Sequence, residues 1–215
     1  MKKNCQTFAG IVCFLVLSCF FPPAFAAPTL SGSTGMIRIP TADVLRPGQF
    51  SAGAWYWENR GASVLAVGVA PNFEISAGAP WNTGSADAWT VNAKVNLTQE
   101  ALLIPAVAVG VEDIDGRGRG SFYGVVSKVL PFGFRVHIGA GTGRFDGMFA
   151  AVEKVLNPTS IKKQGSGFPV TSLILEMDGA KLNVGARMRL ARGLRLDVGW
   201  LGQEERMVLG LTYTN

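Results

Sequence analysis

Few residues of this chain are candidates for catalysis. It contains one histidine, His137. Residues two positions apart on a strand share a face, so Arg135 and Gly139 would lie beside it. A two-histidine metal site cannot be built from it, and a serine–histidine array would have no histidine other than His137 to use. We interpret His137 as a residue that lines the inside of a barrel, the fold predicted below.

Two carboxylates, Glu176 and Asp178, are also two residues apart and would share one face of a strand. Such a pair could perform acid–base chemistry or bind a cation. The alternative, which we favour, is a ladder of opposite charges across neighbouring strands. The partners in that ladder would be Arg187, Arg189, Arg195 and Asp197. The sequence therefore predicts no catalytic residue, no metal site and no cofactor.

Two motifs lie close together between residues 113 and 120. Asp113-x-Asp115-Gly116 has the beginning of a calcium loop, but the later ligands are absent. Arg117 and Arg119 alternate with glycines, which is typical of a flexible basic loop. We hypothesise that this loop contacts anionic lipopolysaccharide or acidic polysaccharide.

These residues lie on segments in which apolar and polar residues alternate, as they do in strands with two different faces. About twelve such segments (10–12) follow Gly48, starting near residues 49, 63, 73, 88, 102, 121, 133, 148, 171, 181, 193 and 207. From Trp89 to Thr98, for example, Trp89 and Val91 share the apolar face, whereas Asn92 and Lys94 share the polar one. The segment near 148 alternates weakly.

The connections between segments are mostly short and long in turn. Residues 70–72, 130–132 and 191–193 form short connections, whereas residues 58–62, 81–87, 113–120, 141–147 and 202–206 form longer ones. Transmembrane barrels have short periplasmic turns and longer outer loops. Two connections break the rule, because 157–170 is long and 178–179 is short.

Alternation alone fits either a soluble β-sandwich or a transmembrane β-barrel, in which the polar face lines the lumen. Small residues beside charged ones on the polar face favour the barrel. Aromatic residues near strand ends also favour it, because barrels carry aromatic girdles at the membrane interfaces. The girdle candidates are Trp55, Tyr56, Trp57, Trp81, Trp89, Trp200 and Tyr213. The predicted lumen-facing binding candidates are Asn92, Lys94, Arg135, His137, Glu176, Asp178, Arg187, Arg189, Arg195 and Asp197.

The first 26 residues are typical of a cleaved signal peptide. Lys2 and Lys3 precede an apolar run, and Ala24-Phe25-Ala26 is a cleavage pattern. All three cysteines lie in this leader, so no disulfide is expected. Cleavage before Cys19, which would leave a lipid anchor there, is the alternative. After a signal peptide of residues 1–26, residues 27–47 would form a periplasmic or plug-like segment, and 48–215 an all-β antiparallel transmembrane barrel.

The charge of the chain argues against a nucleic-acid partner. Hydrophobic residues make up 48% of the chain and charged ones 16%. The net charge is +5; without Lys2 and Lys3, 18 basic residues face 15 acidic ones, which gives +3. So mild a charge predicts no nucleic-acid partner.

The motif Gly32-Ser33-Thr34-Gly35-Met36-Ile37-Arg38-Ile39-Pro40-Thr41-Ala42 resembles the start of the YjbH-like outer-membrane family. Later stretches at 173–179, 183–185, 193–199 and 210–213 are similar to that family too, although Met177 replaces an aromatic residue. The best-known members are much longer than this chain. The resemblance implies an outer-membrane barrel associated with exopolysaccharide production or export, here in a short single-unit form.

We therefore expect a non-enzymatic barrel in the outer membrane that supports exopolysaccharide production or export. Its expected partners are outer-membrane lipid and lipopolysaccharide, with polysaccharide or envelope export proteins as further candidates. The alternatives are a secreted β-sandwich that binds glycans and a lipid-modifying barrel enzyme. The enzyme would need a Ser/His or His/Asp cluster near one rim, whereas His137 lies in the middle of a strand.

Overall fold

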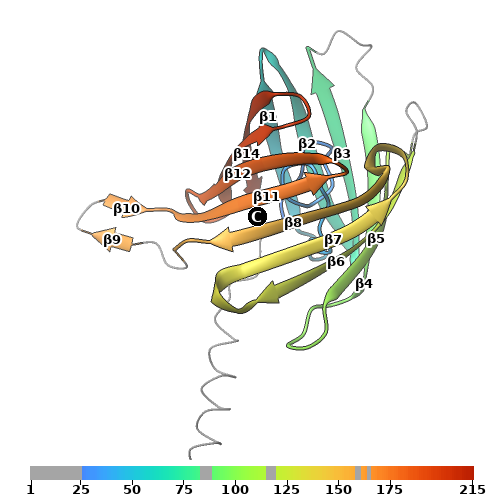
Figure 1. Cartoon of the computed structure of the whole chain (residues 1–215), viewed down its shortest axis with the longest axis horizontal. Coiled ribbons are helices and arrows are strands. Elements are labelled where there is room, and N and C mark those ends of the chain that lie inside the picture. Colours follow the sequence, from blue (N-terminus) through green and yellow to red (C-terminus); the bar gives the residue numbers. More distant parts are fainter. Residues whose placement is uncertain (1–25, 83–88, 115–119, 158–160, 164–165) are drawn as a thin grey trace, which may run out of the picture.

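A computed structural model describes residues 26–82, 89–114, 120–157, 161–163 and 166–215 of the chain. Twelve antiparallel strands form one closed barrel in which neighbouring strands follow the order of the chain, except that β8 pairs with β11, and β1 closes the ring on β14. Figure 1 shows this ring, with the N-terminal segment in blue inside it. The predicted all-β barrel of about twelve strands is confirmed, and the β-sandwich alternative is wrong because the strands form a single closed sheet.

The barrel strands occur in the order of the predicted segments. They are β1 (Phe50–Trp57), β2 (Arg60–Ala70), β3 (Phe73–Trp81), β4 (Thr90–Thr98), β5 (Ala106–Glu112), β6 (Ser121–Leu130), β7 (Phe134–Gly141), β8 (Gly147–Val155), β11 (Val170–Asp178), β12 (Lys181–Arg189), β13 (Leu194–Leu201) and β14 (Arg206–Thr214). Two 3-10 turns, η1 (Pro131–Gly133) and η2 (Gly143–Phe145), precede β7 and β8. Among the described residues, no helix is long and apolar enough to cross a membrane.

The two connections that broke the length rule have different explanations. The long one contains a separate hairpin of β9 (Ile161–Lys163) and β10 (Ser166–Phe168), which pair with each other and project from the ring in Figure 1. The short one is a tight turn between β11 and β12 in which Gly179 has a φ of 64°, a conformation that glycine adopts without strain. The sequence did not predict the β9–β10 hairpin.

Two details of the strand prediction need correction. The strand expected near residue 102 begins at Ala106, because Leu102, Leu103 and Ile104 lie exposed in the preceding connection. The weak segment near 148 is a complete strand, β8. Its alternation is blurred because Lys154 lies on the outward face at the strand's end, where its ammonium bonds Phe132 O and lies 4.2 Å from the Phe134 ring centroid.

The two faces of the barrel wall have opposite character. On β4, Asn92, Lys94 and Asn96 are buried in the lumen, whereas Val95 and Leu97 are exposed on the outside. Large apolar side chains are exposed on strands all around the ring. A soluble protein would normally cover such a surface, so this wall is suited to an apolar surrounding.

Two of the seven aromatic girdle candidates lie on the other face. Trp55 and Trp57 are buried in the lumen, with exposed fractions of 0% and 8%. The Trp55 ring fills the space above Gly210 on β14, where a Cβ would lie 2.8 Å from it. Tyr56, Trp89, Trp200 and Tyr213 are exposed on the outside, as expected. The sequence Trp55-Tyr56-Trp57 puts aromatic residues on both faces of the strand. These residues alone therefore could not show which face lines the lumen.

Candidate functional site: a lumen occupied by the N-terminal segment

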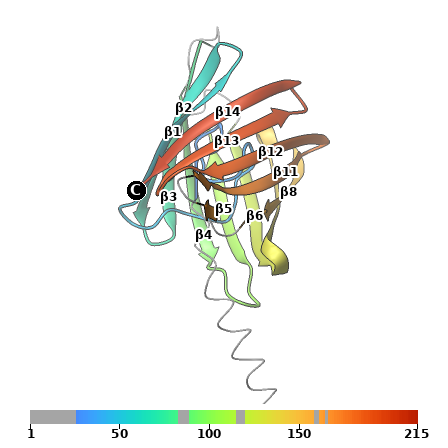
Figure 2. The same ribbon diagram turned by 90° about the vertical axis from the view of Figure 1, so that its left-hand side faces the viewer.

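Residues 27–45, called the plug below, lie inside the barrel, and most of them are buried. Figures 1 and 2 show the strands surrounding this segment from two directions. The plug contains no helix and only isolated bridges, Pro28 with Thr34 and Gly35 with Pro40. Its backbone folds back on itself, with Leu30 N–H bonded to Ile37 O and Thr41 N–H to Thr34 O. Many of its other backbone groups bond side chains of the barrel wall.

The first of the wall contacts is made by Glu74 on β3 and Lys94 on β4. The Glu74 carboxylate accepts hydrogen bonds from the N–H groups of Thr34 and Leu45, both at 3.1 Å. The Lys94 ammonium donates to the carbonyls of Thr34 at 2.7 Å and Thr41 at 3.2 Å. Glu74 Oε1 and Lys94 Nζ lie 3.7 Å apart. Both charges are almost fully buried, so each depends on the other and on the plug for compensation.

The second contact lies on the opposite wall, at Glu176 on β11. Its carboxylate accepts the N–H of Ile37 at 2.6 Å and of Arg38 at 3.2 Å. Asn183 on β12 donates its amide to the second oxygen at 3.3 Å. Three N–H groups thus converge on the two acceptor oxygens of one buried carboxylate.

The third contact is made by Arg187 on β12. Its Nε donates to Asp197 Oδ1 on β13 at 2.6 Å, and Nη2 donates to the carbonyls of Gly35 and Met36 at 3.3 Å. Arg187 and Asp197 are also direct neighbours in the strand register. One side of the guanidinium therefore completes a wall ion pair while the other holds the plug.

The fourth contact involves the lone histidine. Ser127 on β6 accepts the N–H of Ala42 at 2.9 Å, and its hydroxyl is 2.7 Å from Nδ1 of His137 on β7. Arg135 Nη2 donates to Asp43 Oδ1 at 2.7 Å. Burial, the largest single effect, would raise the pKa of the Asp43 carboxyl, but Arg135 together with His137 and Lys94 outweighs it and holds the pKa below its ordinary value.

The plug also reaches the end of the barrel opposite the C-terminus, which we call the loop end. There Arg38 forms ion pairs with Asp178, at 3.6 Å, and with Glu204 in the β13–β14 loop. Arg144 in η2 donates to Glu112 Oε2 at 2.6 Å and to Arg38 O at 2.8 Å. Connections of the loop end thus hold the plug through charge pairs in which Arg38, Glu204 and Arg144 are about one quarter exposed and Glu112 is buried.

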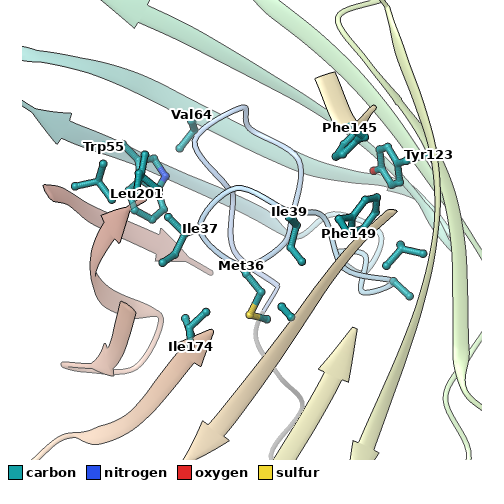
Figure 3. Packing of buried hydrophobic residues seen from close by; sticks show 14 of the residues in the cluster. Met36, Ile37, Ile39, Trp55, Val64, Tyr123, Phe145, Phe149, Ile174 and Leu201 are labelled. Atoms are coloured by element: carbon teal, nitrogen blue, oxygen red, sulfur yellow. The ribbon is translucent and has the colours of Figure 1, made fainter. Parts of the chain in front are cut away.

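An apolar core lies between the plug and the wall. Figure 3 shows Ile37 near Trp55 and Leu201, and Ile39 facing the aromatic group of Phe149, Phe145 and Tyr123. The rings of Phe145 and Tyr123 are 5.1 Å apart between centroids. The lumen is therefore packed in the manner of a protein core at this level.

Ile37 also fits a notch made by two glycines. Gly185 on β12 and Gly199 on β13 are direct partners in the register. Ile37 Cδ1 lies 2.5 Å and 2.8 Å from the positions that their Cβ atoms would occupy. Any larger residue at either site would overlap with the plug.

The structure places the predicted lumen residues on one face, but many of their partners differ from those expected. Lys94, Glu176, Asp178 and Arg187 contact the plug directly. The lumen candidates that are buried are Asn92, Lys94, Arg135, His137, Glu176, Arg187, Arg195 and Asp197; Asp178 and Arg189 are partly buried. The predicted charge ladder is seen at Arg187–Asp197 and, at 3.9 Å, Arg195–Asp197, whereas Asp178 pairs with Arg38 of the plug. Glu176 pairs instead with plug N–H groups, because Asn183 rather than an arginine faces it on β12.

Several functional residues escaped the sequence interpretation. Glu74, Asn96, Ser127, Glu112 and the notch glycines all contact the plug or its supports. Glu74 alternates with Phe73 and Ile75, so the same parity rule would have found it. Arg117 and Arg119 of the predicted basic loop lie outside the described residues.

Catalytic or metal chemistry has little geometric support in the described part of the chain. There, no group of three or more His, Cys, Asp or Glu side chains is placed to hold a metal ion. The Ser127–His137 pair is fully buried, and Ser127 Oγ already accepts a bond from the plug. A substrate would have to displace the plug before reaching it.

A sequence model of the family described as exopolysaccharide biosynthesis protein YbjH matches residues 29–174, more than half of the chain. The chain belongs to the YjbH family. The matched range begins in the plug and ends on β11, so it spans most of the YjbH-family barrel together with the segment that fills it. No curated protein matches the chain. The predicted family membership is confirmed.

Proposed function

We propose that this YjbH-family chain is a non-enzymatic outer-membrane barrel that supports exopolysaccharide production or export. The observation that carries the membrane placement is the division of the wall into an apolar outer face and a polar lumen. In water, exposure of these apolar side chains would be unfavourable, whereas in lipid the same exposure is favourable. The polysaccharide role is supported by the family.

Because the plug fills the lumen, it limits how the barrel could take part in polysaccharide production or export. With polar contacts on opposite walls and an apolar core between them, the resting barrel does not offer an open channel of polysaccharide width. We therefore propose that the barrel with its plug in the lumen acts as a surface or assembly component. Passage of a polysaccharide through the lumen would require the plug to leave it. A lipid-modifying enzyme is less well supported, because the lone histidine lies beneath the plug.

Placement can be tested on the full chain in its own cells. We expect it in the outer-membrane fraction, with a gel mobility that changes on boiling because closed barrels resist unfolding in detergent. Recovery in the soluble periplasm, without a heat-dependent shift, would reject the barrel's proposed location.

The polysaccharide role needs a separate experiment. Deletion of the gene should reduce the surface exopolysaccharide, and the wild-type gene should restore it. Unchanged exopolysaccharide output in the deletion strain, with the protein demonstrably present in the parent, would reject this half of the proposal.

A further inference from the structure

A groove runs across the outside of the wall near the loop end, over β4 to β7. Its floor is a row of register partners: Val95 pairs with Val109, Val109 with Gly124, and Gly124 with Ala140. These residues alternate with lumen-facing neighbours such as Tyr123, so their side chains face outward. The groove is shallow and widely open to the outside, with a volume of about 550 Å³.

The groove exists because small residues lie in a row between larger ones. A Cβ built on Gly124 would meet nothing within 4 Å, so the floor is open there. Phe122 stands on one side with 64% of its surface exposed, and Val126 and Ile138 continue the outward face on the other. The residues lining the groove include no charged residue, and their polar side chains are those of Thr142 and of Tyr123, whose ring faces the lumen.

We propose that this groove binds an acyl chain of a membrane lipid. The proposal rests on the outer-membrane placement proposed above, because only then does lipid surround the wall. The groove is continuous with the apolar face that would contact hydrocarbon, and its lining carries no charge and one outward hydroxyl, that of Thr142, which already accepts the N–H of Phe122. A flexible chain of methylenes can follow a narrow concave floor. The convex, pleated wall of a second copy would leave the floor empty and lose packing contacts.

The test fills the groove without touching the lumen. In Gly124→Phe the new ring would occupy the floor, whereas Ala54→Phe adds the same ring to an exposed outward position on β1. The full chain would be reconstituted in phospholipid nanodiscs containing a trace of phosphatidylethanolamine with a photoactivatable diazirine in its acyl chain. Labelled peptides would then be mapped by mass spectrometry.

We expect the wild-type chain and Ala54→Phe to be labelled preferentially on peptides of β4 to β7. Gly124→Phe should lose that preference, with at least fivefold less label on these peptides. Even labelling around the barrel, or a preference that survives Gly124→Phe, would overturn the proposal. So would a wild-type dimer in detergent that Gly124→Phe dissolves, because the groove would then be an interface between copies.

Membrane fractionation and the heat-dependent gel shift of each variant separate the two proposals. If the wild-type chain is absent from the outer membrane, the proposed function fails first. If it is present and heat-modifiable but shows no preferential label, only the lipid groove fails. Gly124→Val, which fills less of the groove, replaces Gly124→Phe should the latter not give a heat-modifiable barrel, and a partial loss of label is then expected.

Discussion

The Glu176 carboxylate on β11 accepts a 2.6 Å hydrogen bond from the backbone N–H of Ile37, a residue 139 positions earlier in the chain. A wall side chain thus recognises the plug through its backbone. The same holds for Glu74, Lys94 and Arg187, whose plug partners include backbone N–H or C=O groups. The lumen side chains therefore bind the plug backbone in one specific, irregular conformation.

Replacing Glu176 with glutamine tests this recognition. Glutamine keeps one acceptor oxygen but turns an NH₂ group toward N–H donors, so at least one of three bonds is lost. We expect seating of the plug to weaken by about 1–3 kcal/mol. Planar-bilayer recordings should show openings that the wild-type barrel lacks, and proteolysis of residues 27–47 should become faster.

The matched control for that change is Glu205→Gln, which removes the same charge from an exposed loop position. It should leave both conductance and proteolysis unchanged. Equal effects of the two substitutions would mean that net charge, and not the bond to Ile37, governs the plug.

The glycine notch allows a test by paired substitutions. Gly199→Ala would place a Cβ 2.8 Å from Ile37 Cδ1, with no backbone atom nearer than 3.5 Å. Overpacking of this kind costs about 1–3 kcal/mol. Ile37→Val removes the overlapping methyl group, so the double variant should be more stable in urea than the sum of the two single effects predicts. Strict additivity would show that the notch and Ile37 are not in contact.

The fold was far easier to predict than the plug, and the reason is the range of the interactions. Alternation in segments such as 89–98 is local, and it correctly predicted twelve strands and the lumen-facing position of Lys94. The plug shows no regular alternation of apolar and polar residues. Its hydrogen bonds join Thr34 to Glu74 and Ile37 to Glu176, which are 40 and 139 residues apart in the chain. No local pattern specifies such pairs.

Parity also failed where both faces of a strand have the same character. Trp55 and Tyr56 are alike in type, yet one fills the lumen and the other faces outward. Only the closure of β1 on β14, which brings Gly210 under the Trp55 ring, decides between them. The strand near 102 was misplaced for a related reason, because an apolar triplet in a connection imitates the start of a strand.

The two faces should differ in their sensitivity to tryptophan truncation. Trp55→Ala would open a cavity in the packed lumen and should cost about 3–5 kcal/mol. Trp200→Ala removes a ring that is 41% exposed on the outside, where lipid can fill the space, so its cost should be clearly smaller. Urea unfolding in lipid vesicles measures both, and a larger loss for Trp200→Ala would reverse the assignment of the faces.

Asp43 gives the plug a defined pH dependence. Its pKa in the folded chain lies below the ordinary value of 3.8, because Arg135, with smaller contributions from His137 and Lys94, outweighs the effect of burial. A carboxyl with a depressed pKa contributes its full stability above the unfolded value, and loses it as pH falls through the folded value. The stability difference between the wild-type chain and Asp43→Asn should therefore be constant from pH 7 to about pH 5 and shrink below about pH 4. Comparing the two chains by urea unfolding at each pH cancels the titration of the other carboxylates, and a difference that grows on acidification would show that the Asp43–Arg135 pair does not hold the plug.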